Sequence, residues 1–393
     1  MKKIILVFLI LIIISFANAA TYQDISPKVL IQDSDIIVRG KIVNIKFSQE
    51  GIHIFDTGII SVNKVLKGEK IISEVNIIFS GKNSVKKSSL DICYKLEDKG
   101  IWMLKKIENN SYRVYHPDCF QNESTEKVIQ YILKHKPLSD FEKIKSESDD
   151  FAKLLIVKYL RHEGIESSIP LLINMLSEKK SDIVNNSNKA LYRITNQIFI
   201  DKDEILPEEK KELAKKWRVW WEINKNYSRE KWVKQGIERD IKLLNNKDAD
   251  IRAFATKRLL EFTGQYGFVG SGYAPQTPEA IGKWERWWPD NKDKPMREWA
   301  ISLLTSNDPV HRQYGITLAV DLIKFGDTEL YSYLIKVLMD QYDWLAQYAI
   351  EGLYMLTGEK FGFMTMNPPE KNLKSIKLWM DWYNKNIKEK RHN

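Results

Sequence analysis

The sequence is poor in cysteine and histidine, with two cysteines and six histidines among 393 residues. The histidines are scattered, and no His-Glu-x-x-His helix is present. Two thiols alone cannot complete the four ligands of a structural zinc site. The sequence also lacks a Gly-x-Ser-x-Gly nucleophile elbow. We therefore expect no metal and no other cofactor, and no catalytic motif indicates an enzyme.

Long apolar runs are also lacking, with one exception at the N-terminus. Two lysines precede an apolar run over residues 4–16, and Ala17-Asn18-Ala19 follows it. This order is typical of a secretory signal peptide, and the run is shorter than the ~20 residues of a membrane-spanning helix. We expect cleavage after residue 19 and export to the periplasm or the medium, with an uncleaved anchor as the alternative. No cysteine follows the cleavage site, which argues against a bacterial lipoprotein.

An exported chain folds in an oxidising compartment, where an even number of cysteines within one small domain favours a disulfide. Both cysteines, Cys93 and Cys119, lie in the N-terminal portion of the chain. We therefore predict a structural disulfide between them.

Charge of one sign is not gathered into blocks. The formal net charge is +9, but acidic and basic residues alternate, as in residues 208–212. Such mixing predicts solvated helix faces and not a phosphate-binding stripe. Together with the expected export, it argues against a nucleic-acid partner.

Residues 20–136 have the pattern of a small β-domain. Runs rich in β-branched residues are separated by turn residues such as Gly51 and Gly68. Five or six short strands within about 100 residues predict a small barrel or sandwich. The predicted strands cover residues 34–45, 57–65, 75–79, 100–104 and 112–115. A polar, charged stretch at 137–149 is the expected linker.

Three short motifs stand in this domain: an aspartate with an apolar run at 35–42, Val-Leu-Lys-Gly at 65–68, and glycine, aromatic residue and leucine within 100–104. This series resembles the OB-type barrel of tissue metalloprotease inhibitors, netrin modules and related bacterial extracellular proteins. The resemblance implies an OB-like barrel and suggests inhibition of a secreted hydrolase. The inhibitor families begin the mature chain with a metal-chelating cysteine, whereas this chain would begin Ala20-Thr21-Tyr22.

From residue 150 onward the periodicity becomes helical. Short amphipathic segments recur in pairs, and Asp248 and Asp308 stand where an aspartate would cap the second helix. These segments resemble HEAT repeats. The predicted pairs are 169–176 with 188–195, 236–244 with 250–263, 296–304 with 309–323, and 328–339 with 344–357.

A longer motif occurs three times. Thr195, Thr263 and Thr357 are followed 22, 21 and 22 residues later by the first tryptophan of a cluster. Gly264 and Gly358 directly follow two of the threonines, and Asn196 follows the third, as expected where a helix ends in the left-handed region. The aromatic clusters are Trp217, Trp220 and Trp221; Trp284, Trp287 and Trp288; and Trp379, Trp382 and Tyr383.

Each aromatic cluster lies on a predicted helix of its own. A Pro-Glu pair at 207, 278 and 369 marks the start of each helix, and a loop aromatic precedes it at Phe199, Tyr266 and Phe361. Spacing on one helical face favours burial of the tryptophans between helix layers. The alternative is an exposed binding surface, for which the candidate residues are Trp221, Trp288 and Trp382.

The order of a Thr-Gly helix end, an aromatic loop and a Trp-x-x-Trp helix resembles bacterial HEAT-like repeat proteins of the phycobilin-lyase-repeat type. The resemblance covers about residues 150–388 and implies binding and scaffolding. Lyase activity belongs to a few pigment-attaching members and does not follow from the repeat alone.

These patterns predict an α+β protein with a signal peptide at 1–19, a small OB-like β-barrel at 20–136, a linker at 137–149 and a HEAT-like helical solenoid at 150–393. We expect an exported binding or scaffold protein that engages a protein or peptide through its helical surface. Two alternatives stay open: inhibition of a secreted hydrolase by the β-domain, and an envelope polysaccharide binder or enzyme. A pair of catalytic carboxylates cannot be recognised from one sequence.

Overall fold

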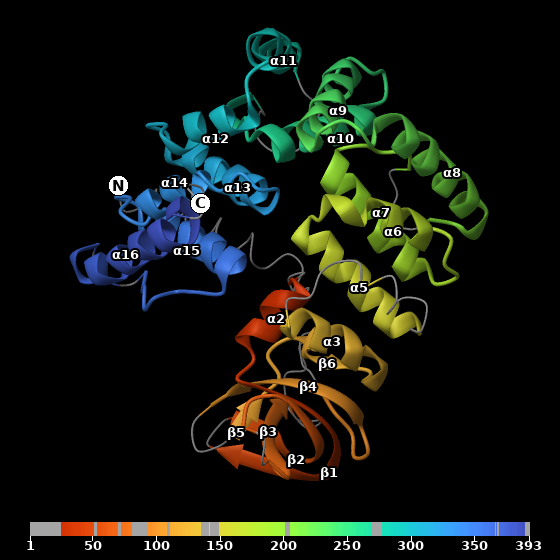
Figure 1. The fold of residues 1–393 in the computed structure, drawn as a ribbon, viewed down its shortest axis with the longest axis vertical. Coiled ribbons are helices and arrows are strands. Elements are labelled where there is room, and N and C mark those ends of the chain that lie inside the picture. Colours follow the sequence, from red (N-terminus) through yellow and green to blue (C-terminus); the bar gives the residue numbers. More distant parts are fainter. Residues whose placement is uncertain are drawn as a thin grey trace. The chain divides into compact units, whose positions relative to one another are not determined.

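The computed structural model divides the chain into two compact units, residues 1–159 and residues 160–393 (Figure 1). The predicted signal peptide and most of the predicted linker lie outside the described residues. The structure describes residues 25–50, 53–69, 72–80, 93–107, 111–134, 141, 149–200, 205–268, 277–365, 367 and 369–389.

A closed β-barrel forms most of the first unit. The strand order is β1-β2-β3-β5-β4, and β1 also pairs with β4, which closes the sheet. The β3–β5 pair is parallel and the other pairs are antiparallel. This arrangement confirms the predicted small β-barrel. The strands are β1 (Ile36–Glu50), β2 (His53–Lys67), β3 (Glu74–Ser80), β4 (Lys99–Lys106) and β5 (Ser111–Arg113), with β6 (Phe120–Gln121) added to β4.

The barrel core is built around Trp102 on β4, which is fully buried. Its indole nitrogen donates a hydrogen bond of 3.0 Å to the Gly40 carbonyl on β1. A Cβ at Gly40 would collide with the Ser61 carbonyl on β2, so the close approach of β1 and β2 requires glycine there. The ring of Tyr94 meets Trp102 edge-on, with centroids 4.8 Å apart. Two helices, α2 (Pro27–Asp33) and α3 (Glu126–Leu133), complete this unit together with most of α5 (Asp150–Glu163).

The predicted disulfide between Cys93 and Cys119 is not formed. Cys119 lies fully buried in a 3-10 turn, Pro117–Cys119, whereas Cys93 is exposed. The Cys119 thiol is hydrogen-bonded with the Tyr115 hydroxyl inside the core, and burial raises its pKa to about 12. The prediction was wrong because an even cysteine count carries no information about whether each thiol is buried or exposed.

The second unit is an array of paired helices. The four predicted pairs are α6–α7, α9–α10, α12–α13 and α14–α15, and the helices α8, α11 and α16 carry the aromatic clusters. The fold is therefore the predicted α+β arrangement of a small β-barrel followed by an array of helices. The bounds are α6 (Ile169–Met175), α7 (Ser181–Thr195), α8 (Pro207–Asn224), α9 (Arg229–Leu243), α10 (Ala249–Thr263), α11 (Pro278–Asn291), α12 (Met296–Leu304), α13 (Pro309–Lys324), α14 (Leu330–Val337), α15 (Asp343–Thr357) and α16 (Pro369–Tyr383).

The repeated threonine ends its helix by a local hydrogen-bond pattern. The Thr263 hydroxyl donates to the Leu259 carbonyl at 2.6 Å and accepts from the Gln265 amide at 3.3 Å. The same two bonds occur at Thr195 and at Thr357. The next residue then takes the left-handed conformation, with φ of 55° at Asn196, 68° at Gly264 and 79° at Gly358.

The first tryptophan of each cluster is fully buried and meets a loop phenylalanine edge-on. The ring centroids are 4.9 Å apart for Phe199 and Trp217, and 4.8 Å apart for Phe361 and Trp379. In the second copy Phe268 takes this place at 5.0 Å, whereas the expected Tyr266 stacks on Tyr314. The three copies of the motif therefore share the same side-chain packing as well as the same sequence pattern.

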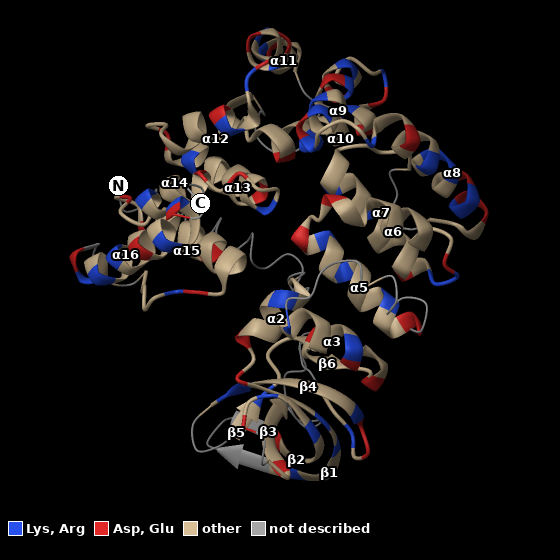
Figure 2. Ribbon diagram, in the orientation of Figure 1, with Lys and Arg blue, Asp and Glu red and all other residues tan. Residues whose placement is uncertain are grey.

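Lysine and arginine alternate with acidic residues on most helices of the second unit, as Figure 2 shows. Among the described residues, no helix combines the length and the apolar composition needed to cross a membrane.

Candidate functional site

The second helices of the four pairs, α7, α10, α13 and α15, form one layer. The Tyr192 ring on α7 packs against Phe262 on α10, with centroids 5.6 Å apart, and α13 contacts both α10 and α15. Figure 1 shows α10 and α13 nearer the middle of the curve traced by this unit than α9 and α12. We call the water-accessible faces of these four helices the inner surface. The residues that matter below are Tyr192, Phe254, Glu261, Asp321, Trp344, Tyr348 and Met355.

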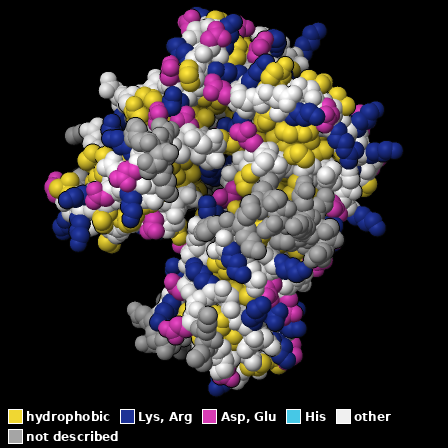
Figure 3. Space-filling model, in the orientation of Figure 1, with side chains coloured by type: hydrophobic (Ala, Val, Ile, Leu, Met, Phe, Trp, Pro, Cys, Tyr) yellow, Lys and Arg dark blue, Asp and Glu magenta, His cyan; other side chains and the backbone are white. Residues whose placement is uncertain are grey.

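An apolar row runs along α15 on this surface. Trp344, Tyr348 and Met355 are 38%, 44% and 42% exposed and share one helical face. The rings of Trp344 and Tyr348 meet edge-on at 6.2 Å, so the row is an ordered aromatic ridge. Phe254 on α10 is 43% exposed. Figure 3 shows apolar side chains gathered over α7, α8 and α10 as well. An ordered row of exposed apolar side chains such as the one on α15 is a candidate interaction site.

A polar pair lies on the same surface. The Tyr192 hydroxyl donates a hydrogen bond of 2.8 Å to a Glu261 carboxylate oxygen. Burial raises the pKa of Tyr192, and the Glu261 charge raises it further. Burial also raises the pKa of Glu261, and the negative charge of Asp321 raises it further. The hydrogen bond from Tyr192 and the positive charges of Arg193 and Lys257 lower it, but they do not cancel the increase. Because the Glu261 side chain still reaches water, this carboxylate is available to a cationic or hydrogen-bonding group.

Two largely buried ion pairs connect α9 to the helices of this layer, one to α13 and one to α10. Arg229, at the start of α9, donates to the Ile194 carbonyl at 3.0 Å and to Asp321 at 2.7 Å. Arg258 on α10 binds both carboxylate oxygens of Asp240 on α9, at 3.1 Å and 3.0 Å. Both arginines are 5% exposed. These pairs fix the spacing of the helices and leave the surface above them pre-formed.

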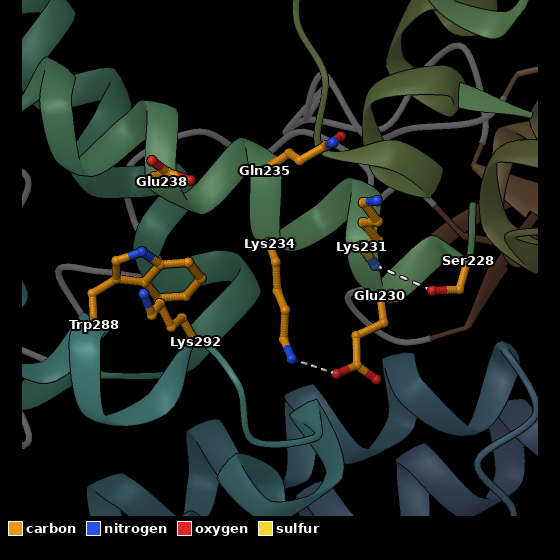
Figure 4. A pocket seen from close by; sticks show the side chains of 8 residues that line it. All are labelled: Ser228, Glu230, Lys231, Lys234, Gln235, Glu238, Trp288 and Lys292. Atoms are coloured by element: carbon orange, nitrogen blue, oxygen red, sulfur yellow. Dashed lines mark hydrogen bonds and ion pairs between the residues drawn. The ribbon is translucent and has the colours of Figure 1, made fainter. Parts of the chain in front are cut away.

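The second and third residues of the aromatic clusters are only half-buried. Trp221 packs against Trp232 at 5.8 Å, and Trp288 packs against Trp299 at 6.3 Å in the equivalent place. Trp382 meets Tyr331 at 5.2 Å. All three candidate residues thus keep accessible ring surface, and Trp288 lines a pocket of about 360 Å³ between α9 and α11 (Figure 4).

One sequence-based expectation depends on residues that the structure does not describe. The mature N-terminus Ala20-Thr21-Tyr22, on which the comparison with metalloprotease inhibitors depends, lies outside the described residues. Within the described part of the chain, no group of three or more side chains is arranged to hold a metal ion.

The residues of the inner surface were missed by sequence reasoning. Tyr192 and Glu261 are 69 residues apart, and no local pattern links them. The row on α15 did have a signal, because Trp344 and Tyr348 alternate with the buried Leu345 and Ala349 and must therefore face outward.

In comparisons with known proteins, no protein family, no curated protein and no solved structure matches the chain.

Proposed function

We propose that this protein binds a protein or peptide partner along the inner surface of its helical unit. The observation that carries the proposal is the exposed apolar row Trp344, Tyr348 and Met355 on α15. Helical repeat arrays use extended surfaces of this kind to bind their partners. Exposed aromatic anchors supply most of the binding energy in such interfaces.

The polar pair on α7 and α10 supports a partner segment with mixed character. Apolar side chains of the partner would pack on the α15 row, and a lysine or arginine would pair with Glu261. The raised pKa of Glu261 reflects the protein around it and the nearby Asp321 charge. An incoming cation would stabilise the charged carboxylate against both effects, so a basic residue flanked by apolar residues is the sequence that this surface favours.

Export supports a partner in the periplasm or outside the cell. The basis is the arrangement of residues 1–19, with lysines, an apolar run and an Ala-x-Ala pattern. The OB-like barrel would then add a second contact or serve as an N-terminal cap of the array.

Site-specific photo-crosslinking tests the proposal. A benzophenone amino acid replaces Tyr348, and in a matched control it replaces Lys242, whose side chain is 72% exposed on α9 away from the inner surface. We expect one discrete crosslinked partner with the Tyr348 probe and none with the Lys242 probe in an envelope extract.

A binding measurement with the purified partner completes the test. Tyr348→Ser is expected to weaken the affinity by at least about tenfold, whereas Lys242→Ser leaves it unchanged. Equal crosslinking at both positions, or an affinity unaffected by Tyr348→Ser, would show that the inner surface is not the binding site.

A further inference from the structure

The pocket beside Trp288 lies on α9 and α11 and shares no residue with the inner surface. Figure 4 shows the side chains of Trp288 and Lys292 on one side and those of Glu230 and Lys234 across from them. Its volume of about 360 Å³ falls near the lower end of the ~300–1,000 Å³ typical of small-molecule sites. The pocket can therefore take a small chemical unit such as one sugar ring with its substituents.

The walls of the pocket are rigid. Trp288 is braced by Trp299, at 6.3 Å between ring centroids, and is followed within the helix by Pro289. Lys234 donates to the Lys294 carbonyl at 2.7 Å and pairs with Glu230 at 2.6 Å. Its side chain is only 18% exposed, so it ties α9 to the segment after α11. A pre-formed wall lowers the entropy cost of binding.

The pocket has surplus positive charge. Glu230 is neutralised by Lys234, and the other lining carboxylate, Glu238, pairs with Lys242. Lys231 and Lys292 have no carboxylate partner among the described residues, and the Lys231 ammonium lies 3.4 Å from the centre of the Tyr227 ring. Lysine offers only donors, so these two residues favour an anionic acceptor.

The combination of surfaces identifies the chemical class of the ligand. A pyranose ring has one face of C–H groups that packs on an indole, while its hydroxyls need both donors and acceptors. Trp288 supplies the apolar face, Gln235 supplies an amide with both functions, and Lys292 supplies a cation. Charge-assisted bonds from lysine favour an anionic group on the sugar, and a uronic acid carries its carboxylate on the ring itself, so that one ring can reach both Trp288 and Lys292.

We propose that this pocket binds an acidic saccharide, with one ring face on Trp288 and its carboxylate paired with lysine. The site is separate from the inner surface and does not depend on the partner proposed there.

Titration of the full-length protein with short oligosaccharides tests this site by calorimetry and by quenching of tryptophan fluorescence. The probes are oligogalacturonate, oligoglucuronate, the neutral methyl ester of oligogalacturonate, and AMP. We expect at least one acidic oligomer to bind about tenfold more tightly than the neutral ester and than AMP. The difference should shrink at high salt because it depends on charge.

Variants assign the binding to the pocket. Trp288→Ala and Lys292→Gln should each weaken binding of the acidic oligomer by about tenfold or more, whereas Trp288→Phe keeps part of it. Trp221→Ala is the matched control, because Trp221 has the same place in the first repeat and similar packing on Trp232. It should leave the affinity unchanged and shows whether loss of a braced tryptophan alone disturbs the unit.

Four results would overturn the proposal. They are affinity unchanged by Trp288→Ala, equal binding of the acid and its ester, tighter binding of AMP, and no binding of either acidic oligomer at about 10 mM. None of them bears on crosslinking at Tyr348, so the two proposals fail separately.

Discussion

Arg229 and Asp321 are 92 residues apart in the chain, and yet their side chains meet at 2.7 Å. The same guanidinium donates to the Ile194 carbonyl and lies 3.4 Å from the centre of the Phe325 ring. One arginine at the start of α9 therefore joins the end of α7 to α13. The helical layer that carries the inner surface depends on this contact.

Replacement of Arg229 tests that dependence. Arg229→Met should lower the free energy of unfolding by about 3 kcal/mol, because Asp321 loses its partner in a partly buried position. The control Lys242→Met removes an exposed pair with Glu238 and should cost no more than about 0.5 kcal/mol. Urea unfolding followed by circular dichroism measures both. Equal effects of the two substitutions would contradict a structural role for Arg229.

The glycine that ends α10 should be less replaceable than another left-handed glycine. Gly264 has φ of 68°, and a Cβ there would lie 2.7 Å from a Leu303 methyl group. Gly326 has φ of 98° with no atom within 4 Å of the same position. Both Ala variants incur backbone strain of about 1–2 kcal/mol, and Gly264→Ala adds a steric cost. A thermal melt in which Gly326→Ala is the less stable variant would refute this explanation.

The repeated threonine should contribute through its hydroxyl. Thr263→Val keeps the shape but removes the bond to the Leu259 carbonyl and leaves the Gln265 amide without its acceptor. We expect a loss of about 1–2 kcal/mol in the free energy of unfolding. Thr317→Val serves as the control, because that hydroxyl is exposed and its bond to the Gln313 carbonyl is long, at 3.3 Å. If both variants unfold at the same urea concentration, the hydrogen bonds of the Thr263 hydroxyl do not contribute to stability.

Stability should depend on pH through Glu261. Burial raises its pKa in the folded state above the ordinary 4.5, so the folded protein binds the proton more tightly than the unfolded chain does. Between those two pKa values stability therefore falls as the pH rises, and above both the full cost remains. Glu261→Gln should be more stable than the natural protein at neutral pH, and the difference should vanish below the ordinary pKa. Urea unfolding at about pH 4 and pH 7 gives the comparison, and a difference independent of pH would exclude this cause.

The two thiols should react at different rates with Ellman's reagent. Cys93 is exposed, whereas Cys119 is fully buried with a pKa raised to about 12. The thiolate is the reactive form, so one thiol should react in the native protein and two in denaturant. Detection of no thiol in non-reduced, unfolded protein would instead indicate the disulfide.

Elements whose ends are set by local chemistry could be predicted from the sequence. Pro207, Pro278 and Pro369 begin the helices that the Pro-Glu pairs indicated. The three helices that end at Thr195, Thr263 and Thr357 stop where a left-handed residue follows. In the barrel, β-branched runs marked the strands, although β1 and β2 are longer than the predicted segments.

The candidate sites could be predicted only in part. Trp288 was named as a candidate because of its place in the repeat, but its pocket needs Lys234 and Gln235 from a different helix. The contact between Tyr192 and Glu261 has no counterpart in any local pattern. The proposed disulfide failed for a related reason, because direction relative to the core decides whether two thiols can meet.

The sequence by itself determined where the three helices of the repeated motif end, because the hydrogen bonds that cap them join residues only two to four positions apart. It also determined that the helical repeats exist, since the same signals recur at nearly the same spacing. Only the tertiary structure decided which side chains share a surface. Arg229 meets Asp321, Tyr192 meets Glu261, and Trp288 and Lys234 line one pocket, because helices pack side by side and bring together residues far apart in the chain.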